Sequence, residues 1–385
     1  MRIAVTGTRG VPATHGGVEH QCEEIYSRLA AQGHDITIYV RSHYVARGIQ
    51  SYRGMTIKRL PTINTKYSEA LVHTFLATLH ILKENFDIVH YYGQGPCLFS
   101  PLVRLFRPST RIFFTCGGLD WQRKKWPSWA SGIIYLGEVC SARYPHYRIV
   151  VSRDLQHYYR SRHHKDSFYI PNGVDIPAKR PIHLLRQFGL SERGYFLFVG
   201  RLVPEKRIED LILAYQKLPR RSRLVIVGDS AGTDGYVRKL KKMAGAAPSI
   251  LFAGYQFGES LGAFYSNALA FVSASELEGL PLTLLEALSH GLPCICSDIA
   301  PHREILGVET VEDLVFPTYD TDALSEKLQI AESMAPDKLN ELGARAAGSV
   351  GRDFSWDAAA SSLAQLYRES RQTERRGKLV QGVTK

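Results

Sequence analysis

The sequence predicts an α/β protein built from two doubly wound parallel-sheet domains, and three observations support this prediction. Strand and helix patterns alternate in two successive series along the chain. A chain of 385 residues is long for a single hydrophobic core and suits two domains. A segment near residue 171, "PNGVDIPAKRP", has the proline and glycine content of a linker. We therefore expect a first domain over residues 1–175 and a second over residues 176–356.

The first domain is predicted from short apolar runs that are typical of strands covered on both faces. These runs lie at residues 2–7, 35–40, 87–92, 111–116 and 147–152, and helix patterns lie at residues 18–34 and 70–85. The first of these helices is expected to end at Gly33, because glycine commonly follows the last turn of a helix.

The second domain repeats this order of elements. Strand patterns lie at residues 195–202, 223–229, 250–255, 268–275 and 293–297, and helix patterns at residues 207–218, 236–245 and 281–290. A final helix is expected from about residue 357, packing back on the first domain, with the polar stretch 371–385 as a loose tail. The cleft between two such domains is the expected binding site.

The segment 275–294 places Glu278 and Glu286 on either side of a Gly-Leu-Pro turn. We expect Pro281 to be the first helical residue and Gly291 to follow the helix end. Ligands of parallel sheets bind beyond the carboxyl ends of the strands, where helices begin. An anion is therefore expected there, held by the N–H groups of Leu280, Leu282 and Thr283. A nucleotide-sugar would supply hydroxyls for both carboxylates and phosphates for these N–H donors. The alternative is that Glu278 caps the helix and Glu286 is a solvated helix residue.

The turn after the first strand, "GTRGVPATHGG", allows a rival interpretation. Gly7, Gly10 and Ala13 approximate a dinucleotide-binding turn, and Arg41 suits the 2′-phosphate of NADP. A short-chain reductase of that type needs a Tyr-x-x-x-Lys pair, and no tyrosine here has a lysine four residues later. The turn instead continues to 16–17, a wide glycine loop whose backbone amides can approach a pyrophosphate.

The motif "GRLVPEK" follows the first strand of the second domain. Its Arg201 and Lys206 lie where the strand ends, and a guanidinium with an ammonium can neutralise a diphosphate. The alternative is that both are solvated loop cations with no such role.

Charge is unevenly distributed along the chain. Residues 1–180 contain 24 Lys and Arg against 12 Asp and Glu, so the net charge of +11 belongs to this half. A phosphorylated substrate, an anionic membrane surface, nucleic acid or simple solubility can each account for such an excess. The chain begins directly with a strand pattern, and its six cysteines form no metal-binding spacing, so we expect a cytoplasmic protein.

Together these motifs resemble family 4 of the glycosyltransferases, which are retaining enzymes with the two-domain GT-B fold. The matching segments are the Gly-Gly pair at 16–17, "GRLVPEK" at 200–206 and "EGLPLTLLE" at 278–286, which fits the family's E-x7-E pattern. Their order and separation match across nearly the whole chain. The segments "TCGGLDWQRKKW", "VSRDLQHYY" and "IPNGVD" are similar to a rhamnosyltransferase-type subgroup that builds bacterial surface polysaccharides.

The resemblance implies a nucleotide-diphosphate sugar held by the C-terminal domain and an acceptor held by the basic N-terminal domain. It implies that Glu286 binds ribose hydroxyls, Glu278 the donor sugar, and Arg201 and Lys206 the phosphates. Glu278, Arg201 and Lys206 are thus the candidate catalytic residues. The other candidate donor-binding residues share a place in turns at strand ends: Gly16, Gly17, Gly200, Gly228, Tyr255, Gly279, Leu280 and Thr283.

One position departs from the family pattern. A polar residue usually precedes the glycine of the "GLDW" segment, and Gly117 stands there instead, which predicts an altered pocket or slow catalysis. Asp120 and Trp121 remain as acceptor-side candidates; the alternative is a capped turn and a packed aromatic. No cofactor or metal is expected, because the cations neutralise the diphosphate. The "DTD" at 320–322 resembles a metal motif but precedes a helix, where aspartate is an ordinary N-cap.

The expected function is transfer of one sugar to a lipid-linked or growing polysaccharide. The alternatives are a subunit that binds a nucleotide-sugar without turnover and a nucleotide-sugar epimerase of the same fold. Nucleic acid is not an expected partner, because the basic residues are scattered and no reading motif accompanies them. Cations mixed with bulky apolar residues at 104–111, 121–129 and 158–165 predict reversible attachment to an anionic membrane surface.

Overall fold

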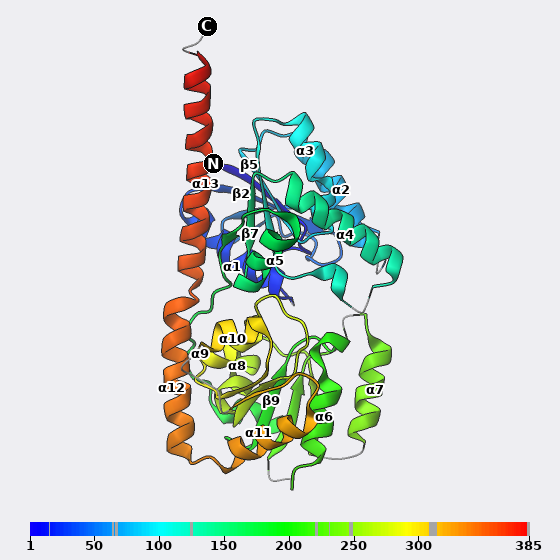
Figure 1. The fold of residues 1–385 in the computed structure, drawn as a ribbon, viewed down its shortest axis with the longest axis vertical. Helices are drawn as coiled ribbons and strands as arrows, with labels where there is room; N and C mark the ends of the chain where they lie inside the picture. Colours follow the sequence, from blue (N-terminus) through cyan, green and yellow to red (C-terminus); the bar gives the residue numbers. More distant parts are fainter. Residues whose placement is uncertain are drawn as a thin grey trace. The chain divides into compact units, whose positions relative to one another are not determined.

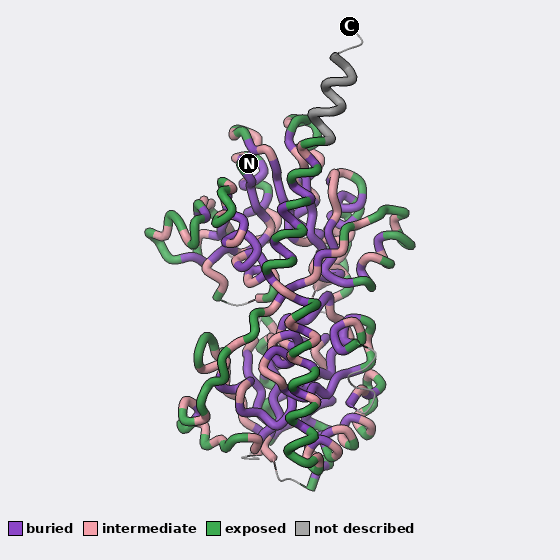
Figure 2. The backbone as a smooth tube through the Cα atoms, turned by 90° about the vertical axis from the view of Figure 1, so that its left-hand side faces the viewer, coloured by how far each residue is buried: buried purple, intermediate pink, exposed green. Residues whose placement is uncertain are grey.

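The computed structural model describes residues 1–385 except 15, 64, 66–67, 124–125, 220–221, 231, 246–248, 308–313 and 383–385, and only the backbone of 373–382. The chain divides into two compact units: Met1–Gly173 with Trp356–Lys385, and Val174–Ser355. Each unit has its own sheet and its own buried core (Figures 1 and 2). The predicted fold class is therefore confirmed.

The first unit contains an eight-stranded sheet of order β3-β4-β2-β1-β5-β6-β7-β8. All neighbouring strands run parallel except β3, which is antiparallel to β4. The chain order reverses between β1 and β5, which makes a topological switch point. The strands are β1 (Arg2–Thr6), β2 (Asp35–Arg41), β3 (Ser51–Tyr52), β4 (Met55–Leu60), β5 (Ile88–Tyr92), β6 (Arg111–Cys116), β7 (Tyr147–Val150) and β8 (Phe168–Tyr169).

Helices of the first unit connect these strands, and the last one returns from the far end of the chain. They are α1 (Gly17–Ala31), α2 (Glu69–Ile81), η1 (Pro96–Phe99), α3 (Ser100–Phe106), η2 (Asp120–Gln122), α4 (Ser128–Arg143), α5 (Arg153–His163) and α13 (Trp356–Gly382). Helix α13 packs against α1 (Figure 1). Its helical backbone continues to Gly382, through most of the stretch for which a loose tail was predicted.

The second unit contains a six-stranded, fully parallel sheet of order β11-β10-β9-β12-β13-β14, with its switch point between β9 and β12. Its strands are β9 (Tyr195–Val199), β10 (Arg223–Val227), β11 (Ile250–Gly254), β12 (Ala270–Ser273), β13 (Cys294–Ser297) and β14 (Val315–Phe316). Its helices are η3 (Ile182–Phe188), η4 (Pro204–Lys206), α6 (Ile208–Gln216), α7 (Asp234–Ala244), α8 (Gly258–Asn267), α9 (Leu282–Ser289), α10 (Ala300–Leu306), α11 (Thr321–Ser333) and α12 (Pro336–Asp353).

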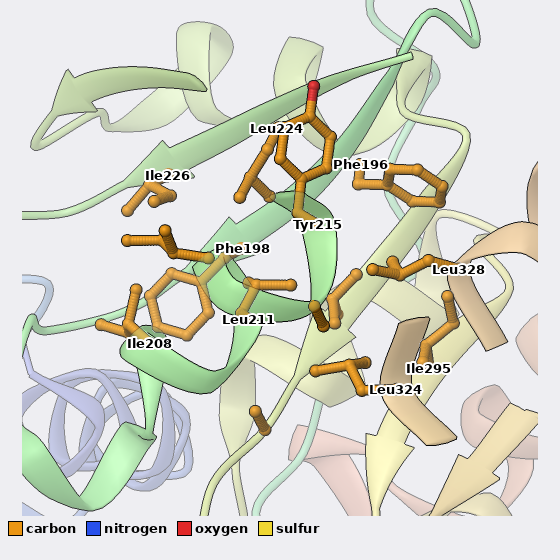
Figure 3. Close-up of a cluster of buried hydrophobic side chains, with 14 of the residues drawn as sticks. Phe196, Phe198, Ile208, Leu211, Tyr215, Leu224, Ile226, Ile295, Leu324 and Leu328 are labelled. Atoms are coloured by element: carbon orange, nitrogen blue, oxygen red, sulfur yellow. The ribbon is translucent and has the colours of Figure 1, made fainter. Parts of the chain in front are cut away.

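A cluster of buried side chains joins one face of this sheet to α6 and α11 (Figure 3). Alternate residues of β9 and β10 point into it, and the helices supply leucines at helical spacing. The labelled members are Phe196, Phe198, Leu224 and Ile226 from these strands, Ile208, Leu211 and Tyr215 from α6, Ile295 from β13, and Leu324 and Leu328 from α11. Burying each such side chain contributes about 2 kcal/mol, which holds the strand ends in place.

Helix α12 approaches the turn after α9 so closely that a Cβ on Gly343 would lie 1.9 Å from the carbonyl oxygen of Gly291. Gly343→Ala is therefore expected to destabilise the second unit by about 2 kcal/mol through overpacking. On the same helix, a Cβ on Gly348 would meet only the Arg352 guanidinium, at 3.8 Å. Gly348→Ala should leave the melting temperature unchanged or raise it slightly. Calorimetry compares the two variants, and equal melting temperatures would contradict this packing.

Candidate functional site

The loops after β9 and β12 meet at the switch point of the second unit. Lys206 ends η4 in the first of these loops, and Glu278 lies in the second. Their Nζ and Oε1 atoms are 2.5 Å apart, and the two side chains are only 13% and 11% exposed. The backbone N–H of Glu276 donates to the carbonyl of Glu205 at 2.9 Å, which ties the two loops together. The structure thus brings two of the predicted catalytic residues into direct contact.

The surroundings of Glu278 keep its carboxylate ionised. Burial alone raises the pKa of this group, but the Lys206 ammonium, the nearby His302 and hydrogen bonds from Lys206 and Ser275 outweigh burial and lower the pKa below its usual value. Because the folded state holds the charged form more strongly than the unfolded state, this pair stabilises the fold above the unfolded pKa of Glu. That stability is lost as the pH falls through the lowered folded pKa.

His302 lies close to Glu278 and was not predicted as part of the site. It belongs to α10 and is fully buried. Its Nδ1 lies 2.9 Å from the carbonyl oxygen of Ser297, to which it donates, and its Nε2 lies 3.3 Å from the hydroxyl of Ser273. Burial lowers its pKa, and the charge of Glu278 partly offsets this effect. No spacing pattern marks a lone histidine after a strand, so only the fold reveals it.

Two predicted glycines lie at the ends of β9 and β10, where the backbone must pack tightly. A Cβ on Gly228 would lie 1.8 Å from the carbonyl oxygen of Gly200, and both residues have positive φ angles, 133° and 157°. Arg201 follows Gly200 and is half-buried. The next residue ties the two turns together, because the N–H of Leu202 donates to the backbone carbonyl of Asp229 at 3.0 Å. The close approach of these turns explains why glycine is needed at position 228, and the positive φ favours glycine at position 200.

Tyr255 follows β11 at the same edge of the sheet. Its hydroxyl donates to the carbonyl of Ser230 at 3.0 Å, and its ring stacks on Phe257 with centroids 6.0 Å apart. Both rings are partly exposed, 36% and 53%. An exposed aromatic face at a strand end is a surface on which a nucleotide base can stack.

Helix α9 begins one residue later than predicted. Pro281 has a ψ of 110° and is the N-cap, because this extended backbone places it outside the helix, and its carbonyl accepts from Leu284 and Leu285. The N–H groups of Leu282 and Thr283 therefore form the helix N-terminus. Gly279 and Leu280 are buried in the preceding turn. Gly291 ends the helix as predicted, with a φ of 74°.

Glu286 lies in the second turn of α9 and is half-buried. Its Oε2 accepts the hydroxyl of Tyr265 at 2.8 Å, and the Tyr265 ring stacks on His290 with centroids 5.3 Å apart. Burial, and then the charge of Glu286, raise the pKa of Tyr265 well above its usual value. This tyrosine fixes the carboxylate in one orientation, although no motif in the sequence predicted it as part of the site.

In the first unit, the glycine turn leads into α1. Gly16 is the N-cap with a φ of 104°, and Gly17 is the first helical residue. A Cβ on Gly16 would lie 2.2 Å from Oε2 of Glu19, whose Oε1 accepts the N–H of Arg9 at 3.1 Å. The buried Glu19 thus holds the turn against the helix N-terminus, and the φ of 104° favours glycine at position 16.

The acceptor-side candidates follow β6. A Cβ on Gly117 would meet only Cγ2 of Val18, at 3.6 Å, so packing does not force glycine there. Asp120 pairs with Arg123 at 2.8 Å. The indole N–H of Trp121 donates to Oε2 of Glu138 at 2.7 Å. Neighbouring side chains thus hold Asp120 and Trp121 in place, and Glu138 belongs to this region although no motif predicted it.

Asp320 is the N-cap of α11, as predicted, and accepts the N–H groups of Asp322 and Ala323 at 3.1 and 2.9 Å. Across the described residues, no group of three His, Cys, Asp or Glu side chains is placed to hold a metal ion. All six cysteines are buried and unpaired. In the described part of the chain, no helix combines the length and apolar character needed to cross a membrane.

Comparison with known proteins agrees with this geometry. Residues 15–177 match the family "Glycosyltransferase Family 4", and residues 184–349 match "Glycosyl transferases group 1". The O-antigen chain mannosyltransferase B of Escherichia coli is 31% identical over 206 residues, 52% of each chain. The GDP-mannose-dependent α-(1-6)-phosphatidylinositol monomannoside mannosyltransferase of Mycobacterium tuberculosis is 28% identical over 52% of this chain and 55% of the relative. The chain thus spans about half the length of these relatives.

Solved structures extend the similarity of fold to almost the whole chain. Sucrose-phosphate synthase from Thermosynechococcus elongatus has a TM-score of 0.83 at 22% identity, covering 97% of this chain and 99% of that one. Anabaena HepE in complex with UDP-glucose has a TM-score of 0.78 at 14% identity, covering 96% and 99%. The two parallel-sheet units and the two consecutive family matches place the chain in family 4 of the glycosyltransferases, with the GT-B fold.

Proposed function

We propose that this protein transfers a hexosyl or deoxyhexosyl group, with retention, from a nucleotide-diphosphate sugar to a lipid-linked or growing polysaccharide acceptor in cell-surface polysaccharide synthesis. The observation that carries the proposal is the Lys206–Glu278 pair at the switch point of the second unit, beside the N-terminus of α9. The relatives that are named mannosyltransferases for O-antigen chains and phosphatidylinositol mannosides support this class of donor and acceptor.

In this proposal the second unit holds the donor and the first unit holds the acceptor. Arg201 and Lys206 bind the diphosphate, together with the N-terminus of α9. Glu278 binds hydroxyls of the sugar, and Glu286, oriented by Tyr265, binds the ribose. The glycine turns at strand ends let the backbone approach the phosphates, and Tyr255 supports the base. The proposal includes rhamnosyl transfer, because rhamnose is a deoxyhexose.

The chemistry follows from where charge develops. Breaking the bond between sugar and phosphate leaves negative charge on the diphosphate and positive charge on the anomeric carbon. An ammonium has three N–H donors, of which Glu278 accepts one, so the Lys206 ammonium also has donors for phosphate oxygens. Because it already lies in the site, it stabilises the leaving group without reorganisation. The acceptor hydroxyl then attacks the anomeric carbon from the face that the diphosphate leaves, and its proton passes to an oxygen of the departing diphosphate. These cations replace a metal, so transfer is expected to persist in the presence of a chelator.

A thermal-shift screen against GDP-mannose, UDP-glucose and dTDP-rhamnose tests donor binding. A ligand at a hundred times its Kd stabilises the folded state by about 2.7 kcal/mol, which raises the melting temperature by several degrees. At least one nucleotide-sugar is expected to do so, and its free sugar is not. No shift with any nucleotide-sugar at millimolar concentration would contradict the proposal.

Gly117 favours a second candidate, a subunit that binds the nucleotide-sugar without turnover, or an epimerase that acts on the donor alone. The space beside Val18 can accommodate a side chain at position 117. Steric crowding therefore does not explain the absence of a polar residue there. Slow release of nucleoside diphosphate by the purified protein would exclude the inactive subunit. A changed sugar still attached to the nucleotide would indicate the epimerase.

We also propose reversible attachment to an anionic membrane through the first unit. Helices α3 and α4 contact each other, and each of them exposes large apolar side chains and an arginine. This α3–α4 surface consists of Leu105, Phe106, Trp129, Leu136 and Val139, 37 to 71% exposed, with the exposed Arg104 and Arg143. Of the cations first predicted for this role, Lys124 and Lys125 lie outside the described residues.

Co-sedimentation with phosphatidylcholine vesicles, with and without phosphatidylglycerol, tests the α3–α4 surface. Binding is expected only to the anionic vesicles and is expected to fall with salt. Replacing Arg104 and Arg143 by Ser should weaken it by roughly tenfold or more. Leu105→Ser with Phe106→Ser should also weaken it, whereas Leu213→Ser, at a 42% exposed leucine of α6, should not. Equal recovery with neutral and anionic vesicles at low salt would refute the attachment.

A further inference from the structure

Glu138 is a fully buried carboxylate on α4 whose two oxygens each accept two hydrogen bonds. Oε2 accepts from Nε2 of Gln94 at 2.5 Å and from Nε1 of Trp121 at 2.7 Å. Oε1 accepts from the hydroxyl of Tyr158 at 2.7 Å and from Nε2 of His163 at 2.8 Å. A buried carboxylate is tolerated only when its oxygens are satisfied in this way. Glu138 is therefore the centre of a hydrogen-bond network, which we call the Glu138 hub, in which four side chains donate to one carboxylate.

The donors come from three separate segments. Gln94 lies in the turn after β5, Trp121 lies in η2 after β6, and Tyr158 and His163 lie on α5, which contacts α4 (Figure 1). A second bond links the two turns, because Oε1 of Gln94 accepts the N–H of Asp120 at 3.1 Å. One carboxylate thus joins the turns at the carboxyl ends of two neighbouring strands to the helices behind them.

Helix α4 is pressed against the first of these turns. A Cβ on Gly137 would lie 2.3 Å from the carbonyl oxygen of Gln94 and 3.0 Å from Cα of Gly95. The residue next to the hub must therefore be glycine for the carboxylate to reach the turn. Helix α4, with 16 residues, is more than four turns long and does not need this approach for its own hydrogen bonds, so the contact serves the turn after β5.

We propose that Glu138 is the positioning residue that sets the conformation of the Asp120–Trp121 turn and, through it, the affinity for the acceptor. This inference rests on the proposed function, in which that turn lies on the acceptor side. Glu138 does not itself touch substrate, since no part of it is exposed. Its loss is therefore expected to change acceptor binding and to leave donor binding, which belongs to the second unit, unchanged.

Two substitutions separate position from charge. In Glu138→Gln the amide oxygen still accepts from Trp121 and Gln94, and its NH2 group faces Tyr158 and His163, which can both switch to acceptors. Trp121 has no such choice, because an indole N–H only donates. Glu138→Met keeps the volume but removes every acceptor, so the indole N–H and the Gln94 amide are orphaned. Gln is expected to preserve the turn and Met to release it.

The indole signal of Trp121 reports on the turn without any substrate. The chain has four tryptophans, so a ¹⁵N-edited spectrum contains four indole signals, and Trp121→Phe assigns one of them. That signal is expected to shift upfield and broaden in Glu138→Met and to stay close to its wild-type position in Glu138→Gln. An unchanged Trp121 signal in Glu138→Met overturns the proposed hub.

Steady-state kinetics test the consequence for the acceptor, using a prenyl-diphosphate-linked saccharide that the wild-type protein glycosylates. Glu138→Met is expected to raise the acceptor KM at least tenfold, with the Kd for the donor unchanged by calorimetry, and Glu138→Gln to restore KM to within about threefold of wild type. Gly132→Ala is the matched control, because a Cβ at that position of α4 meets nothing within 4 Å.

The outcomes also separate this inference from the proposed function. If the wild type transfers sugar and Glu138→Met leaves the acceptor KM unchanged, the positioning role of Glu138 is overturned and the proposed function stands. A donor Kd that weakens together with the acceptor KM overturns that role too, because the effect is then a general loss of folding. A wild-type protein that glycosylates no acceptor overturns the proposed function and the acceptor role, while the indole signal still decides whether Glu138 sets the turn.

Discussion

Replacing Lys206 by Met is expected to destabilise the second unit by about 3 kcal/mol and to slow sugar transfer by about a hundredfold or more. The side chains of Lys206 and Glu278 are almost completely buried against each other, so removing the ammonium leaves an unpaired carboxylate in a poorly solvated place. The same substitution removes the cation that stabilises the leaving diphosphate. Calorimetry measures the first effect, and nucleoside diphosphate release measures the second.

A double variant separates the two effects. Lys206→Met with Glu278→Leu removes both charges and is expected to recover most of the lost stability, but no activity. The pH dependence of stability also separates the two effects. Lys206 lowers the pKa of Glu278, so the stabilisation by the ion pair disappears as the pH falls through that lowered pKa. The wild type and Lys206→Met should therefore converge in stability at acid pH. A difference that stays constant down to the pH at which the wild type unfolds would contradict the ion-pair account.

Replacing Glu286 by Ala is expected to weaken donor binding by about 30- to 100-fold, which corresponds to the loss of roughly 2 to 3 kcal/mol in hydrogen bonds from ribose hydroxyls to a carboxylate. Titration calorimetry with the nucleotide-sugar found in the thermal-shift screen measures this directly. The control is Tyr265→Phe, which removes the hydroxyl that bonds to Glu286 and leaves the carboxylate in place.

Tyr265→Phe should weaken binding only a few-fold, because the carboxylate loses orientation but not its charge. If Glu286→Ala binds the donor as tightly as the wild type, the ribose assignment is wrong. If both variants lose affinity equally, the effect belongs to the packing of α9 against Tyr265 and not to a contact with the ligand.

Much of the fold was predictable because its strands are short, apolar and separated by glycine turns. The alternation around α9 is a clear case, with an apolar strand before it and Gly291 after it. Helices α4 and α5 were not predicted. Gly132 and Gly137 weaken the pattern of the first, and the second is mostly polar and keeps only Leu155 and Tyr159 buried. Local patterns fail where a helix is held by contacts made elsewhere in the chain.

The site shows the same division. Arg201, Lys206 and Glu278 were predicted from motifs, but their motifs do not reveal that Lys206 and Glu278 bond to each other across 72 positions of sequence. Tyr265 and Glu138 were missed for a related reason. Each is an ordinary residue of an apolar helix in the sequence, and each gains its role only from partners that the topology of the sheet brings to it.

The central claim is that this chain breaks the bond between sugar and diphosphate at the Lys206–Glu278 edge of the second unit and retains the configuration of the sugar. Proton NMR of the anomeric signals during a reaction with an α-configured nucleotide-sugar, with and without acceptor, tests it most directly. We expect nucleoside diphosphate and an α-configured product to appear first, also in the presence of EDTA, and no product with Lys206→Met. A β-configured first product, or equal rates for the wild type and Lys206→Met, would contradict it.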